Sequence, residues 1–117
     1  MKDRLLTIFE TRHFVKFSKK LMGDKERSKL IMYLKDSPKT GDVIAKTGGV
    51  RKLRWTRPGK GKRGGVRIIY YFYDKQGALF LLTVYAKSDK VDLSEKEKSE
   101  YKELVSELIL ALKGENK

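Results

Sequence analysis

The sequence predicts an α+β fold in which helices cover one face of a mainly antiparallel sheet. Three runs rich in β-branched and aromatic residues follow one another at 50–56, 66–73 and 79–87. Their short links favour an antiparallel meander. Segments with helical spacing lie before and after these runs, and residues 5–10 resemble a further short strand. The expected order is therefore β-α-α-β-β-β-α, in a single domain that spans residues 1–117.

The N-terminal third is expected to hold the first strand and two helices. Residues 5–10, LLTIFE, are half apolar, as in a short strand. Thr11 is placed to cap a first helix, and Gly23 is placed to end it. Asp24 then offers an N-cap for a second helix. Residues 38–49, PKTGDVIAKTGG, are rich in turn formers and predict a surface loop.

The C-terminal half holds the strongest strand and the clearest helix. Residues 66–73, VRIIYYFY, are dense in residues that favour strands. Ser94 and Glu97 have the spacing of a capping box, in which each side chain bonds the other residue's backbone N–H. Apolar residues then recur at helical spacing from Tyr101 to Leu112, so Tyr101 is expected to belong to the core.

The positive charge is concentrated in one segment. The chain has 28 Lys or Arg and 15 Asp or Glu, a net charge of +13. Residues 50–67, VRKLRWTRPGKGKRGGVR, contain eight of the cations and no carboxylate. Without them the balance is 20 against 15, or +5. Like charges at this density repel one another, which favours a polyanionic partner, nucleic acid first.

Strand alternation predicts where these charges point. Lys52 and Arg54 share one face of their strand, and Arg67 shares a face with Ile69 and two tyrosines. In the last strand Tyr85 and Lys87 share a face. Cations interleaved with aromatic rings suit RNA, because cations bind phosphates and rings stack on exposed bases. Each cation alone is also compatible with an ordinary solvated face, which normally mixes both signs of charge.

The glycine-rich stretch at 58–65 is expected to be a loop. Its glycines spell GxGxxGxV, a match to nucleotide-binding patterns that we attribute to chance, since a strand and not a helix is expected next. Glycine there allows close approach to a phosphate backbone. The residues expected to bind RNA or ribosome are those of this loop and its flanks. They are Arg51, Arg57, Lys60, Lys62 and Arg63.

Several kinds of site are excluded or disfavoured. The chain has no cysteine and one histidine, His13, so thiolate chemistry, Cys-based zinc and a two-histidine ribonuclease are excluded. His13 is expected to be buried or to cap a helix. Asp89 and Asp92 are more typical of a solvated loop than of a metal site, so we expect neither metal nor cofactor. The sequence has no membrane-spanning run and no pattern typical of a signal peptide, which predicts a cytoplasmic protein without membrane contact.

RNA cleavage needs no metal in principle. The ribose 2′-hydroxyl can attack the adjacent phosphate once its proton is removed, and Arg or Lys can stabilise the charge that develops. A Lys crowded by other cations has a lowered pKa, which suits it to proton transfer. Such a site would benefit from a partner that orients the RNA.

Three stretches resemble the RelE superfamily of toxins, and most closely its HigB-like branch. They are GDVIAKTGGVRKLRW, GKGKRGGVRIIYYFYD and LLTVYAKSDKVDLS, within residues 41–94. The resemblance implies a type II toxin that enters the A site of the 70S ribosome and cleaves mRNA there. It also implies a cognate helix-turn-helix antitoxin, and a toxin that is monomeric alone and oligomeric with that antitoxin.

The resemblance implies catalytic positions at Lys52, Arg54, Arg67 and Lys87. A tyrosine that RelE uses near its C-terminus has only Tyr101 as a counterpart, so Tyr85 or Lys87 is the candidate for proton transfer. Two other functions remain open. One is gyrase inhibition by a ParE-like toxin, which has the same fold, and the other is RNA or ribosome binding without catalysis.

Overall fold

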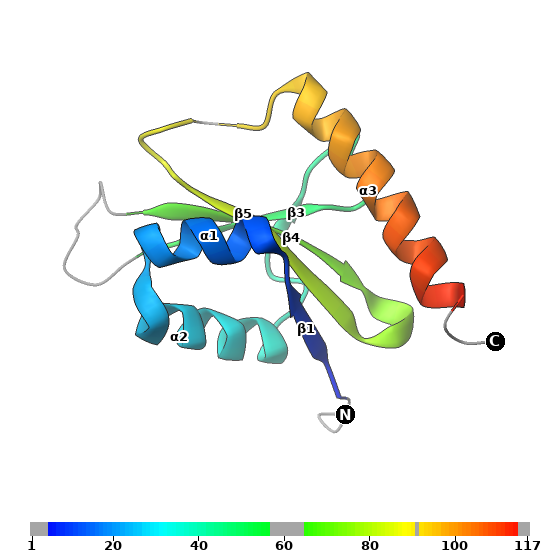
Figure 1. Cartoon of the computed structure of the whole chain (residues 1–117), viewed down its shortest axis with the longest axis horizontal. Helices are drawn as coiled ribbons and strands as arrows, with labels where there is room; N and C mark the ends of the chain where they lie inside the picture. Colours follow the sequence, from blue (N-terminus) through cyan, green and yellow to red (C-terminus); the bar gives the residue numbers. More distant parts are fainter. Residues whose placement is uncertain (1–4, 57–64, 91, 115–117) are drawn as a thin grey trace.

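A computed structural model describes residues 5–56, 65–90 and 92–114 (Figure 1). The elements in chain order are β1 (Thr7–Glu10), α1 (Arg12–Leu21), α2 (Gly23–Asp36), β2 (Asp42–Val43), β3 (Arg51–Trp55), β4 (Val66–Tyr73), the short 3-10 helix η2 (Asp74–Gln76), β5 (Ala78–Ala86) and α3 (Glu95–Gly114). The sheet order is β1-β5-β4-β3-β2. β1 runs parallel to β5, and the other neighbours are antiparallel. The predicted α+β class and mainly antiparallel sheet are confirmed, and β2 is an additional strand inside the predicted loop.

Both faces of the central strands are apolar. On one face of β4, Ile68 and Tyr70 are fully buried in a cluster that includes Phe14 of α1 and Leu30 of α2. We call this the helix-pair face. All nine residues of β5 are buried, so its opposite side also needs a cover. The β4 residues that alternate with Ile68 and Tyr70 therefore belong to a second cluster on the other face.

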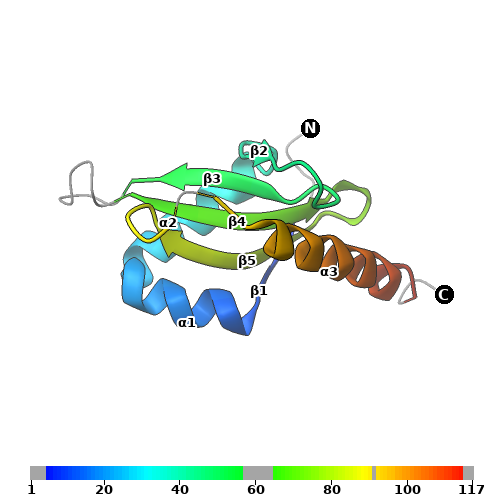
Figure 2. The ribbon, with the colours of Figure 1, turned by 90° about the horizontal axis from the view of Figure 1, so that it is seen from above.

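Helix α3 provides the cover for this second cluster. Tyr71 of β4 and Phe80 of β5 pack there with Val105 and Leu112 of α3. We call this side the α3 face. Figure 2 shows α3 in front of the sheet and α2 behind it. Helices α1 and α2 thus share one face, as the sequence predicts, whereas α3 lies on the other. The sequence predicts a half-exposed sheet, which β4 and β5 are too apolar to form.

The helix ends follow the expected chemistry with one exception. Thr11 Oγ1 accepts a hydrogen bond from the Phe14 N–H at 3.1 Å, which confirms the first cap. Ser94 and Glu97 form the predicted capping box, with bonds of 2.8 and 3.1 Å. Asp24 does not cap α2: the cap position is Met22, and it makes no side-chain bond there. Gly23, with φ of 69°, opens α2 because glycine tolerates that left-handed geometry.

Candidate functional site

Three paired strands bring the predicted cations to one end of the α3 face. The register pairs Arg54 of β3 with Arg67 of β4, and Arg67 with Tyr85 of β5. Lys52 pairs with Ile69, a member of the α3-face cluster. Directly paired residues point to the same side of a sheet. Lys52, Arg54, Arg67 and Tyr85 therefore share one surface, which we call the cationic end, and α3 runs away from it (Figure 2).

The cationic end is held in place from behind. Leu53 and Trp55 alternate with the cations on β3 and pack in the helix-pair cluster. The Trp55 ring lies 5.6 Å from that of Tyr33, and its Nε1–H donates to Glu26 of α2 at 3.3 Å. Strand β3, which carries Lys52 and Arg54 on one face, is thus anchored by Leu53 and Trp55 on its other face.

One carboxylate reaches into the cationic end. Lys52 Nζ donates to Asp92 Oδ1 at 2.6 Å, across 40 positions of sequence. The pKa of Asp92 is lowered, first by this hydrogen bond, then by the charge of Lys52, with smaller contributions from Lys98 and Arg67. Asp92 therefore lies where several cations converge, and at neutral pH it is ionised.

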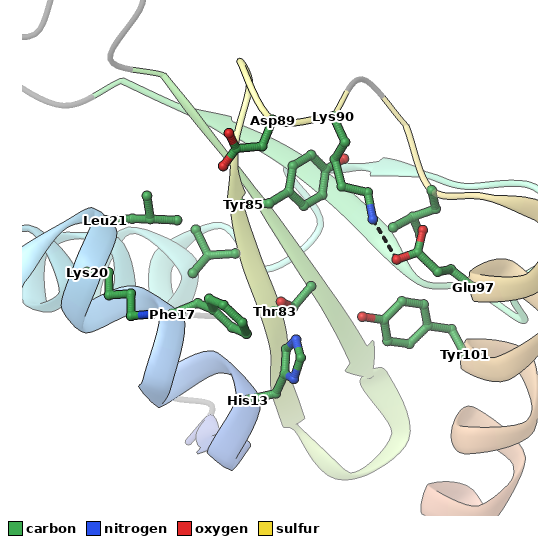
Figure 3. Close-up of a pocket in the computed structure, with 12 residues that line it drawn as sticks. His13, Phe17, Lys20, Leu21, Thr83, Tyr85, Asp89, Lys90, Glu97 and Tyr101 are labelled. Atoms are coloured by element: carbon green, nitrogen blue, oxygen red, sulfur yellow. Dashed lines mark hydrogen bonds and ion pairs between the residues drawn. The ribbon is translucent and has the colours of Figure 1, made fainter.

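Tyr85 is the buried member of the group. Its side chain is 9% exposed, and among the described residues its hydroxyl has no hydrogen-bond partner. The pKa of Tyr85 is raised, mainly by burial and secondarily by Asp92, while Arg67 opposes the shift. Lys90 Nζ lies 5.2 Å from the Tyr85 ring centroid and pairs with Glu97 (Figure 3). Tyr85 is thus a protonated phenol with an uncommitted hydroxyl.

A hollow of about 420 Å³ adjoins Tyr85 between α1 and α3 (Figure 3). His13 and Phe17 of α1 line one side, with ring centroids 4.7 Å apart, and Tyr101 of α3 lines the other. His13 is exposed, so the expectation that it is buried or caps a helix was wrong: Thr11 is the cap, and the His13 ring lies at the wall of the hollow beside Phe17. Tyr101 is partly buried against the core, and burial is the main reason that its pKa rises to about 12.

The other predicted residues lie elsewhere. Lys87 directly follows β5, and its backbone N–H donates to the Gly65 carbonyl at 3.1 Å, so it borders the cationic end. Arg51 pairs with Tyr70 of the helix-pair cluster and donates to the carbonyls of Lys39 and Gly41. It is therefore on the opposite face from Lys52. Arg57, Lys60, Lys62 and Arg63 lie outside the described residues.

Comparison with known proteins identifies the family. Residues 6–116 match the model of the RelE toxin of the RelE/RelB toxin–antitoxin system. The chain belongs to the RelE toxin family. The HigB-like branch stays a prediction.

Solved structures of E. coli proteins support the fold of this RelE-family chain. It is similar to a mutant of the toxin RelE in the free state, with 14% identity and a TM-score of 0.56 over 74% of this chain and 88% of that one. It is also similar to the intact RelBE toxin–antitoxin complex, with 17% identity and a TM-score of 0.51 over 70% and 96%.

Two features of this RelE-family site could not be found from the sequence. Asp92 and Lys90 follow the last strand, and no local pattern connects them to Lys52 or Tyr85. Only the fold brings the segment after β5 back over β3. In the described part of the chain no group of three or more His, Cys, Asp or Glu is placed to hold a metal ion, and none of its helices could span a membrane.

Proposed function

We propose that this RelE-family protein is a ribosome-dependent mRNA endonuclease that cleaves mRNA in the A site without a metal. The observation that carries the proposal is the convergence of Lys52, Arg54 and Arg67 from paired strands beside the uncommitted hydroxyl of Tyr85. Cations placed around a phosphodiester and a proton donor next to them are what transesterification of RNA requires.

In the proposed reaction the 2′-hydroxyl of one nucleotide gives its proton to a solvent water and attacks the adjacent phosphorus. The P–O bond to the 5′-oxygen of the next nucleotide breaks, which leaves a 2′,3′-cyclic phosphate and a 5′-hydroxyl. Arg54 and Arg67 stabilise the additional negative charge on the phosphate oxygens. Tyr85 then donates the proton that the 5′-oxygen acquires and is reprotonated from solvent. Its phenol is protonated at neutral pH, and its hydroxyl, which is buried in this structure, has to become accessible when RNA binds.

The surroundings of Tyr85 suit a single-stranded substrate. The hollow beside it is lined by the rings of His13, Phe17 and Tyr101, on which an unstacked base can lie. The cations themselves lie on an open strand surface, where Arg54 is exposed. Such a site holds RNA without orienting it fully, so a ribosome that presents the codon would supply the missing alignment.

The same proposal includes a cognate helix-turn-helix antitoxin. The RelBE structure contains a toxin together with its antitoxin, and the family is defined by such pairs. We expect the protein to be a monomer alone, an oligomer with its antitoxin, and cytoplasmic, where mRNA and ribosomes are found.

The test is in vitro translation with purified protein, followed by primer extension on the mRNA. Wild type should produce cuts within the reading frame. Arg67→Ala should reduce the rate of cleavage by about 10²–10³-fold, because it removes one group that stabilises the transition state, and Lys52→Ala should also impair it. Lys102→Ala, on the exposed side of α3, makes the same charge change and should cleave normally.

Two results would contradict the proposal. Intact transcripts with normal translation would exclude the nuclease, and DNA damage without mRNA cleavage would favour gyrase inhibition. Full cleavage by both Lys52→Ala and Arg67→Ala would remove this surface from the mechanism.

A further inference from the structure

Asp92 is the carboxylate that meets the cationic end in the described part of the chain. No other Asp or Glu there lies within ion-pair distance of Lys52, Arg54 or Arg67. The side chain of Asp92 is 64% exposed and that of Lys52 is 28% exposed, so the carboxylate lies outside the ammonium group. An incoming anion therefore meets Asp92 before it reaches Lys52.

The chemistry of this contact resembles that of the proposed substrate. A carboxylate and a phosphodiester both offer anionic oxygens that accept short, charge-assisted bonds from Lys and Arg. The charges of Lys98 and Arg67 also lower the pKa of Asp92. The carboxylate therefore lies in the combined positive field of three cations, Lys52 included. A phosphate bound at the same point would accept a hydrogen bond from Lys52 and would lie in the field of the same two further cations.

We propose that Asp92 occupies the phosphodiester position of the RNA substrate, and that it sets RNA affinity by competing for Lys52. The inference rests on the proposed function. RNA binding requires the Asp92 side chain to turn away, which costs little because a solvent-exposed ion pair contributes only a small stabilisation. Once displaced, the carboxylate frees Lys52, yet its charge still lies near the bound phosphate and opposes it.

The test is binding of a short single-stranded RNA whose riboses all carry 2′-O-methyl groups, so that no 2′-hydroxyl can attack. Fluorescence anisotropy at one fixed salt concentration gives the dissociation constant, since salt alone shifts such affinities. Asp92→Asn should bind about two- to five-fold more tightly than wild type. Glu103→Gln removes the same charge from an exposed position of α3 that forms no ion pair with Lys52 in the described structure, and should change the affinity much less.

A double variant separates competition from a general charge effect. In a Lys52→Ala background, Asp92→Asn should lose most of its effect, because the group for which it competes is absent. Equal affinities of Asp92→Asn and Glu103→Gln would overturn the inference. Weaker binding by Asp92→Asn would also overturn it, and would show that Asp92 positions Lys52 for binding.

The Lys52→Ala variant also distinguishes a failure of the proposed function from a failure of the proposed role of Asp92. If it binds RNA as tightly as wild type, RNA does not use this surface, and both proposals fail. If it binds more weakly while Asp92→Asn does not bind more tightly, the cationic end is retained and only the role of Asp92 is rejected.

Discussion

The two ends of the α3 face are built from the same strands and have opposite properties. At one end Tyr71 and Phe80 lie beneath Val105 and Leu112 of α3. At the other, the cationic end, Arg67 lies on β4 two same-face positions before Tyr71, and Arg54 lies beside it. Of the residues in the α3-face cluster, those of α3 pack at the first end, and none of the described helices is placed over these two cations. We call the first the covered end. Helix α3 thus divides one face into a part that stabilises the fold and a part that remains available to a ligand.

The contrast has a consequence for mutagenesis. Burial of apolar surface is the main source of folding free energy, and exposed cations contribute little to it. Substitutions at the covered end should therefore change stability, and those at the cationic end should change activity. Tyr85 is the exception that joins both, because it is buried in the α3-face cluster and yet borders the cations.

The strongest test of the contrast is Tyr85→Phe. Loss of the proposed proton donor should reduce the rate of mRNA cleavage by about 10²-fold or more. The thermal midpoint should stay the same or rise, since the hydroxyl removed is buried without a partner in the described structure. Tyr73→Phe, in a side chain of equal exposure at the covered end, is the matched control and should cleave normally. Normal cleavage by Tyr85→Phe would assign the proton to another group.

Leu82→Ala should show the opposite pattern. Leu82 is 3% exposed and belongs to the α3-face cluster. Its truncation leaves a cavity that should lower the free energy of unfolding by about 2–5 kcal/mol. Denaturant titration measures this loss. Leu110→Ala removes the same atoms from a side chain that is 69% exposed, and should cost less than about 0.5 kcal/mol. Equal effects of the two would mean that α3 does not cover this end.

The smallest expected effect concerns alkaline pH. The pKa of Tyr101 is about 12 in the folded protein against a reference of 10.0, so the folded state keeps a proton that the unfolded state releases. The contribution to stability is complete below pH 10 and declines as the pH rises toward 12.

Urea titrations between pH 9 and pH 11.5 measure this decline. Tyr101→Phe should make stability fall less steeply with pH than it does in wild type. Equal slopes in wild type and Tyr101→Phe would show that Tyr101 is not buried in solution. Tyr70, Tyr71 and Tyr85 also have raised pKa values, so part of the slope should remain in Tyr101→Phe.

Much of the cationic end was predictable because strand alternation is a local property. Lys52 and Arg54 are two residues apart, and the meander made Arg67 and Tyr85 their neighbours. Composition alone does not predict which face a cation occupies, as Arg51 shows. It belongs to the same basic segment as Lys52, but it is one residue earlier, so it lies on the helix-pair face and donates to backbone carbonyls. Asp92 was read as a solvated loop residue because nothing within its own segment points to Lys52.

The sequence by itself determined the long helices and strands, the antiparallel meander and the surface on which Lys52, Arg54 and Arg67 meet, but not the short strand β2. These depend on periodicity and on short links, which act between neighbours in the chain. The tertiary structure alone decided that α3 lies opposite α1 and α2, and that Asp92 reaches Lys52 across 40 positions. These two outcomes follow from the burial of both apolar faces of β4 and β5. That burial depends on the whole core, and no single segment of the sequence specifies it.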